Sequence, residues 1–294
     1  MRIKRFAAIA AIGALALTGA ACGSGGETPS GGGGGTEMNF PEGSTMARLN
    51  EAQAIKIGTK FDQPGFGLQG LDGKPAGFDV EIGKIIASEL GIPEENIQWV
   101  ETPSAVREEV LERGDVDIVV ATYTINDARK ERIDFAGPYY VAGQQIMVKA
   151  DDNSITGPDS FKAGDKKVCS VQGSTPSQNI LPYLKDEASQ LVLFDIYDKC
   201  VDALQQGQVD AVTTDNVILL GYVAESNGAY KLVGEQFTEE PYGIGVKKGD
   251  DQFRNFINDV LEKIYADGRY EQAWKDTAGK FDPNLPEPPP VDRY

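Results

Sequence analysis

The chain has 294 residues, 40% of them hydrophobic, and a formal net charge of −17. This length suffices for two domains of ordinary size, and so acidic a chain argues against binding nucleic acid or adhering electrostatically to anionic lipid. The chain contains no histidine, and therefore lacks the commonest general base and metal ligand. A Ser-His-Asp or Cys-His site is excluded, and we expect neither a metal nor a cofactor.

The N-terminus has the pattern of an export signal. Residues 1–21 combine a basic start with an apolar run and end in small residues before Cys22. This ending resembles a bacterial lipobox, in which Cys22 becomes the lipidated first residue, although Gly19 stands where leucine is usual. Residues 23–36 are rich in Gly and Ser and predict a flexible tether. We expect a lipoprotein on the outer face of the cell membrane; the alternative is a secreted protein with an odd cysteine.

From about Arg48 the chain alternates between strand and helix patterns. In the first half the predicted strands are 54–60, 97–101, 117–122 and 144–149, and the predicted helices are 77–91, 102–113 and 126–132. Residues 133–140 break this pattern. In the second half the predicted strands are 167–171, 191–194, 211–214 and 242–246, and the predicted helices are one from Pro176, 198–206, 216–224, 251–267 and a short one with Trp274. The proline-rich residues 281–294 are expected to be irregular.

Two blocks of βα units imply two α/β lobes with a cleft between them. The chain is expected to cross between lobes near 144–148 and to return near 242–246. The predicted organisation is a signal peptide at 1–21, a lipidated cysteine and linker at 22–47, the first lobe at 48–145, the second lobe at 146–242, a return to the first lobe at 243–280, and a tail at 281–294.

Polar side chains gather where the strand at 117–122 ends and the next helix begins. Thr122, Thr124 and Arg129 lie there, and ligands of open α/β sheets bind outside the carboxyl ends of strands. The guanidinium fork of Arg129 suits a carboxylate, and hydroxyls and free helix N–H groups can add to it.

This region has a counterpart in the second half of the chain. Residues 111–117 and 204–210 both end in Gly-x-Val-Asp before a strand, and superposing them places Thr122 on Asp215. If the two units face each other, a small zwitterion fits between them, with its carboxylate on Arg129 and its ammonium on Asp215. The alternative is a chance match, in which Arg129 is a surface residue and Asp215 a helix N-cap.

The other two cysteines, Cys169 and Cys200, lie in the second half. In an exported protein they favour a disulfide, which would contribute roughly 3–4 kcal/mol in the chain-entropy account. Two buried free thiols are the alternative.

Two motifs carry a resemblance to a known family. Gly77-Phe78-Asp79-Val80-Glu81-Ile82 and the segment 124–129, followed by Ile133-Asp134-Phe135 and Pro138-Tyr139, resemble the signature and ligand segments of extracellular solute-binding protein family 3. Its members deliver polar amino acids to ABC importers. The resemblance covers roughly residues 50–280 and is closer still to actinobacterial glutamate-binding lipoproteins, through 58–65, 169–176 and 242–245. Ala136 and Asn126 depart from the family pattern, which usually has serine and threonine there.

The resemblance implies a two-lobed, type II periplasmic-binding-protein-like α/β fold, with the ligand cleft between lobes joined by two crossover strands. It also implies a monomer. In such a site Arg129 holds the ligand α-carboxylate and Asp215 takes the ammonium. The implied assisting groups are Thr124, the backbone of Thr122, Ser174 and Thr175 from the second lobe, and Phe61 and Phe66 against the ligand methylenes. Lys60 is a candidate for reading a γ-carboxylate, and Arg107 is a second one.

The implied function is a substrate-binding lipoprotein that captures glutamate by hinge closure and delivers it to an ABC permease. The phosphate-loop motif does not occur in the sequence, so the motor and permease are expected to be other chains. The alternatives are a binder of glutamine, aspartate or another polar amino acid, and a sensing lipoprotein. An enzyme on the same fold would need an acid or base that the ligand's charged ends leave free. Glu101 and Asp62 are candidates, but nothing in their sequence spacing distinguishes them from other acids. We therefore expect that the protein is not an enzyme.

Overall fold

The computed structural model describes residues 39–294. The predicted signal peptide, the lipidation of Cys22 and most of the predicted linker lie outside the described residues. Among the helices that are described, none is long and apolar enough to cross a membrane.

The first lobe is built on a five-stranded sheet in the order β5-β1-β6-β13-β7. β1 (Ile55–Thr59) pairs in parallel with β5 (Ile97–Glu101) and β6 (Ile118–Val119). β13 (Glu240–Lys247) pairs antiparallel with β6 and with β7 (Ile133–Ala142). Parallel neighbours require crossover connections, and helices provide them. The helices of this lobe are α1 (Thr45–Ala52), α2 (Phe78–Glu89), η1 (Glu94–Asn96), η2 (Ser104–Val106), α3 (Arg107–Arg113), α4 (Asp127–Lys130), α9 (Asp251–Asp267), α10 (Arg269–Asp276) and η5 (Ala278–Lys280).

The second lobe repeats this plan with the order β10-β9-β11-β8-β12. β9 (Val168–Val171) pairs in parallel with β10 (Leu191–Phe194) and β11 (Ala211–Asp215). β8 (Gln144–Lys149) pairs antiparallel with β11 and with β12 (Tyr230–Val233). The helices of this lobe are η3 (Pro158–Ala163), α5 (Thr175–Asn179), η4 (Leu181–Tyr183), α6 (Glu187–Gln190), α7 (Tyr197–Gln205) and α8 (Asn216–Glu225).

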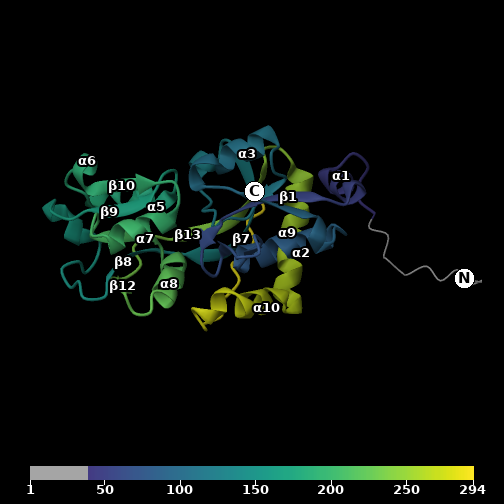
Figure 1. The fold of residues 1–294 in the computed structure, drawn as a ribbon. Helices are drawn as coiled ribbons and strands as arrows, with labels where there is room; N and C mark the ends of the chain where they lie inside the picture. The colour runs from purple at the N-terminus through teal and green to yellow at the C-terminus, as the bar shows by residue number, and fades with distance from the viewer. Residues whose placement is uncertain (1–38) are drawn as a thin grey trace, which may run out of the picture. The chain divides into compact units, whose positions relative to one another are not determined.

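Two segments join the lobes. β7 ends at Ala142 in the first sheet and β8 begins at Gln144 in the second, so the first crossing is at Gly143. Glu240, the first residue of β13, pairs with Ala142, so the return comes a few residues before the expected position at 242–246. In Figure 1, β13 runs from the group of β8–β12 towards the first-lobe elements.

Most predicted elements are confirmed. Helix α1 begins at Thr45, inside the predicted linker 22–47, and buries Met46 in the core of the first lobe. Three further corrections concern strands. Residues 133–140 belong to the ten-residue strand β7. Pro138 hides this strand from sequence analysis, because proline is rare inside strands. It is tolerated here because β7 lies at the edge of the sheet, where the missing N–H removes no hydrogen bond to a neighbouring strand. β12 was missed because its residues are only half-buried and alternate weakly. A small sheet of β2 (Asp62–Gln63), β3 (Gly67–Gln69) and β4 (Pro75–Ala76) lies where a loop was expected.

The predicted repeat is visible in the structure. Gly114 and Gly207 end their helices at φ +73° and +71°, a conformation that favours glycine. The Asp117 carboxylate then accepts from the backbone N–H of Lys56 at 2.9 Å, and the Asp210 carboxylate accepts from that of Lys167 at 2.7 Å. Each lobe therefore fastens the start of a central strand in the same way.

Each lobe has its own core. In the first lobe, aromatic side chains pack around Phe66 and Trp274. In the second, the predicted disulfide between Cys169 and Cys200 is confirmed, with Cα atoms 5.5 Å apart, and it ties β9 to α7 within the apolar cluster.

Candidate functional site

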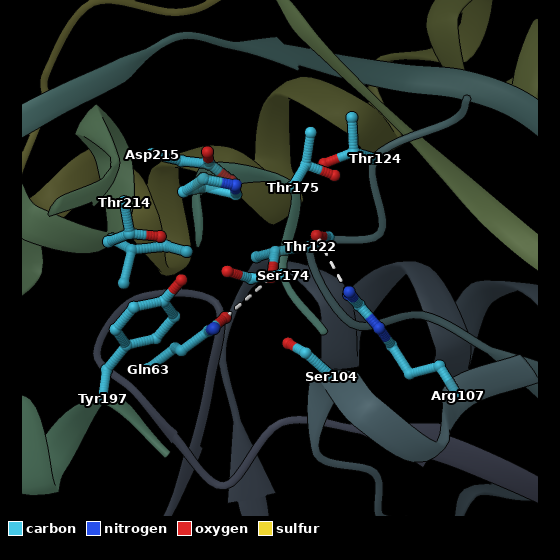
Figure 2. A pocket seen from close by; sticks show the side chains of 12 residues that line it. Gln63, Ser104, Arg107, Thr122, Thr124, Ser174, Thr175, Tyr197, Thr214 and Asp215 are labelled. Carbon is cyan, nitrogen blue, oxygen red and sulfur yellow. Dashed lines mark hydrogen bonds between the residues drawn. The ribbon is translucent and has the colours of Figure 1, made fainter. Parts of the chain in front are cut away.

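The carboxyl ends of the parallel strands meet between the lobes. A small cavity there is lined by residues that follow β1, β5 and β6 in the first lobe and by residues at the ends of β9, β10 and β11 in the second (Figure 2). The lining residues are Gln63, Ser104, Arg107, Thr122, Thr124, Ser174, Thr175, Pro176, Tyr197, Thr214, Asp215 and Ile218. Every one of these strands ends at the site, as expected for α/β sheets.

The cavity has a volume of about 10 Å³, which is about the space of one water molecule. The lobes are therefore closed on each other. A ligand the size of an amino acid can enter only if they move apart or if side chains rearrange.

Thr122 has an unusual backbone at the end of β6. Its φ is +45°, which costs a non-glycine residue roughly 1 kcal/mol or more. Asp79 of α2 compensates, because its carboxylate accepts from the Thr122 N–H at 2.7 Å and from the Tyr139 hydroxyl at 2.6 Å. Burial raises the pKa of Asp79 to about 7, and these two hydrogen bonds oppose that rise. The signature motif thus acts on the site through a backbone hydrogen bond.

Two arginines stack on the ring of Tyr123. The guanidinium carbons of Arg107 and Arg129 lie 4.1 and 5.0 Å from its centroid, within cation–π range. Arg107 is buried and donates to the carbonyl of Ala121 at 2.9 Å. Its Nε has no hydrogen-bond partner among the described residues. A buried, unsatisfied donor at a cavity wall is costly unless a ligand or water accepts from it.

Arg129 lies beside the cavity and bridges the lobes. Its guanidinium donates to the carbonyl of Thr124 at 2.6 Å, to the hydroxyl of Thr175 at 3.0 Å and to the carbonyl of Gly173 at 3.1 Å. Its Nε lies 3.1 Å from a carboxylate oxygen of Glu108. Burial, with Arg107 adding repulsion, lowers the pKa of Arg129 to about 10. Arg129 is only 7% exposed, so the alternative of a surface helix residue is wrong.

Lys60 is also buried behind the wall of the first lobe. Its ammonium donates to the hydroxyl of Ser104, a lining residue, at 2.8 Å. Burial, together with the charge of Arg107, lowers the pKa of Lys60 to about 7. Lys60, Arg107 and Arg129 thus form a cluster of buried cations in the first lobe.

Asp215 faces this cluster from the second lobe. Figure 2 shows it on the opposite side of the cavity from Arg107. One carboxylate oxygen accepts from the Tyr242 hydroxyl at 2.5 Å, and the other has no partner among the described residues. Asp215 precedes α8, but its side chain makes no capping hydrogen bond. Burial, with Glu240 adding repulsion, raises its pKa well above the usual range. A cation placed against its free oxygen would reverse that rise.

The structure brings six predicted ligand residues together in the cavity wall: Arg107, Thr122, Thr124, Ser174, Thr175 and Asp215. Arg129 and Lys60 lie directly behind that wall. Phe66 packs into the aromatic core of the first lobe against Phe78, Tyr140 and Trp274, and Phe61 is half-buried; neither lines the cavity.

Six lining residues were not predicted: the polar Gln63, Ser104, Tyr197 and Thr214, and the apolar Pro176 and Ile218. For the four polar residues a signal existed, because each lies at or just after the carboxyl end of a predicted strand. Applying the strand-end rule to every strand, and not only to those carrying a charged residue, would have found them.

Comparisons with known proteins agree with this geometry. The chain matches bacterial extracellular solute-binding proteins, family 3, over residues 55–277. It is 41% identical over 239 residues to the glutamate-binding protein GluB of Corynebacterium glutamicum, covering 78% of this chain and 80% of that protein. It is 39% identical over 257 residues to the ABC transporter glutamine-binding protein GlnH of Bacillus subtilis, covering 87% and 90%.

Solved structures give the same result. An ancestral arginine-binding protein bound to glutamine matches with a TM-score of 0.71 and 35% identity, covering 76% of this chain and 97% of that one. A solute receptor for L-cysteine of Neisseria gonorrhoeae matches with a TM-score of 0.74 and 28% identity, covering 81% and 95%. The fold is the two-lobed, type II periplasmic-binding-protein fold, and the chain belongs to family 3 of the bacterial extracellular solute-binding proteins.

Proposed function

We propose that this protein is the amino-acid receptor of an ABC importer and that its preferred ligand is glutamate. The observation that carries the proposal is the separation of charge across the cleft. Buried cations gather in the first lobe, and from the second lobe Asp215 presents a carboxylate oxygen that has no partner among residues 39–294. A zwitterion complements this arrangement, with its carboxylate towards Arg129 and its ammonium towards Asp215.

A second carboxylate on the ligand accounts for the remaining cations. Arg129 alone is enough for an α-carboxylate, yet Arg107 and Lys60 are also buried beside the cavity. In the part of the chain that the structure describes, the Nε of Arg107 has no hydrogen-bond partner, so this group and the ammonium of Lys60 can donate to a γ-carboxylate. The named relatives support an amino acid of this size, because one binds glutamate and another glutamine.

Binding by hinge closure is supported by the closed cavity and by the two crossings at Gly143 and before Glu240. In the open form the ligand would first meet the first lobe through Arg129, Thr124 and the backbone of Thr122. Ser174 and Thr175 would then arrive with the second lobe. Removing water from the ligand strengthens each charged hydrogen bond.

The anchor and the partner complete the proposal. Lipidation at Cys22 would hold the receptor on the outer face of the cell membrane, where the closed form would dock on the permease. Loss of labelled glutamate uptake in a strain lacking the protein would support this role, whereas unchanged uptake would favour a sensing lipoprotein.

Calorimetric titration of residues 39–294 tests the ligand. We expect L-glutamate to bind at least about tenfold more tightly than L-glutamine, because one charge-assisted contact contributes roughly 1.5–3 kcal/mol. L-aspartate and L-arginine complete the panel. A preference for glutamine would agree with an amino-acid receptor but contradict the proposed γ-carboxylate contact. Turnover of any ligand would favour an enzyme instead.

Arg129→Ala tests the α-carboxylate contact in the same assay. We expect a loss of affinity of at least about 100-fold for every amino acid bound, because a buried charged donor is removed. Arg132→Ala is the matched control: Arg132 lies three residues further on, is exposed and pairs with Glu112 at 2.7 Å. Equal titration curves for the two variants would overturn the assignment.

A further inference from the structure

A second set of contacts joins the lobes beside the cavity. Asp62 lies in β2 of the first lobe, is 4% exposed and does not line the cavity. Its carboxylate points to α7 of the second lobe, and its backbone carbonyl accepts from the hydroxyl of Tyr222 in α8. A buried charge at this position requires an explanation, since an unpaired carboxylate is costly to bury.

The explanation lies at the beginning of α7. Its N-cap residue is Ile196, which makes no side-chain capping bond because an aliphatic side chain has no acceptor. The N–H of Tyr197, the first residue of α7, donates instead to the carboxylate of Asp62 at 2.7 Å. The first lobe therefore supplies the cap for a helix of the second, and a carboxylate at this end also complements the helix dipole.

Other helices are capped from within their own lobe. Ser174 accepts from the N–H of Ser177 at the start of α5, and Asp250 accepts from that of Phe253 at the start of α9. The cap on α7 differs because its acceptor leaves whenever the lobes separate.

The neighbouring contacts hold the same segment. The Tyr222 hydroxyl that reaches the Asp62 carbonyl also lies 2.9 Å from a carboxylate oxygen of Asp198. One turn of α8 lies against Pro64 so closely that a Cβ on Gly221 would meet the Pro64 carbonyl oxygen at 2.5 Å. The segment 62–64 is thus held between α7 and α8.

We propose that Asp62 is an interlobe latch, a positioning residue that favours the closed form by capping α7 across the cleft without touching the ligand. The inference rests on hinge closure in the proposed function. Opening would solvate both the carboxylate and the Tyr197 N–H, so the latch adds to closure whichever amino acid is bound. The proposal also gives Asp62 a structural role, whereas the sequence left it as a candidate general acid or base of an enzyme.

The test combines ligand dissociation with amide hydrogen exchange on the chain from residue 39. In Asp62→Ala we expect the dissociation rate of L-glutamine to rise about tenfold. Its association rate should not change, and exchange at the Tyr197 amide should accelerate. In the wild type, ligand should slow that exchange. L-glutamine is the ligand of this test because the Asp62 charge also raises the pKa of Lys60, so the substitution can change a γ-carboxylate contact as well.

Two further variants separate the latch from a general loss of stability. Asp250→Ala removes a cap within the first lobe, so it should lower the melting temperature without changing dissociation. Asp62→Asn keeps an acceptor of the same size, so it should fall between the wild type and Asp62→Ala. If L-glutamine dissociation and Tyr197 exchange are both unchanged in Asp62→Ala, the latch is overturned.

The latch remains testable if the wild type binds neither amino acid, an outcome that would overturn the proposed ligand alone. The ligand-free protein should then show faster Tyr197 exchange and a larger radius of gyration by X-ray scattering in Asp62→Ala than in the wild type. Identical exchange and identical scattering would overturn the latch independently of any ligand.

Discussion

Single residues in the cleft owe their chemistry to neighbours that are remote in sequence. Lys60 is a strand-end lysine by sequence, but burial beside Arg107 lowers its pKa to about 7. Arg129 and Asp215 were predicted from residue type and strand position, and the structure brings them to opposite sides of the cleft. The left-handed backbone of Thr122 could not be predicted, since it depends on Asp79 of another element.

The pKa of Lys60 predicts a pH-dependent preference. A γ-carboxylate would raise this pKa, so its contribution to binding should be complete below about pH 7 and should fall as the pH rises. Calorimetry from pH 6 to 8.5 should show the ratio of glutamate affinity to glutamine affinity falling by at most about tenfold per pH unit. The ratio isolates Lys60, because the proton linked to Asp215 is common to both ligands. The charged groups that act on Lys60 are Arg107, Asp62, Arg129 and Asp79.

Lys60→Met should abolish both the pH dependence and the preference for glutamate. Lys56→Met is the matched control, because Lys56 is exposed on the same strand, β1. An unchanged preference in Lys60→Met would assign the γ-carboxylate to Arg107 instead.

At the scale of elements, the βα unit that occurs in both lobes was recognisable from sequence. Its glycine stops and aspartates carry local geometry that adjacent residues determine. Strand β7 was not recognisable, because its interior proline is permitted only by its place at the sheet edge. Pairing partners, and hence edges, are properties of the folded sheet.

The repeated aspartates predict matched losses of stability. Asp117→Ala and Asp210→Ala each leave a strand-initiating N–H without its carboxylate, and we expect each to cost about 1–2 kcal/mol in the free energy of unfolding. Urea denaturation measures this. Asp115→Ala is the control, because Asp115 is exposed and next to the same turn; an equal loss there would contradict the role given to Asp117 and Asp210.

At the scale of the whole described chain, the C-terminal segment covers the free edge of the first sheet. The tail has no regular structure, as expected, yet the Asp292 N–H donates to the carbonyl of Gly137, and the Phe135 N–H donates to the Tyr294 hydroxyl, both at 2.8 Å. The Tyr294 ring also meets the ammonium of Lys130 at 4.0 Å. These contacts protect the edge strand β7 from pairing with another chain.

Removing residues 292–294 should therefore lower the unfolding free energy by about 1–3 kcal/mol and leave amino-acid affinity within a factor of two. Thermal denaturation and titration of the truncated chain measure both. Leu285→Ala, at an exposed side chain of the same tail, should change neither. A large loss of affinity on truncation would mean that the tail supports the ligand site.

The sequence by itself determined the α/β class, most strand and helix positions, the disulfide and the strand-end chemistry, because these depend on local periodicity and residue type. Only the tertiary structure decided that Phe66 belongs to the core, that Gln63, Ser104 and Tyr197 line the cavity, and that Asp62 caps a helix of the other lobe. Each of these depends on which distant segments meet. That is fixed by the packing of whole lobes and their closure, which no window of sequence contains.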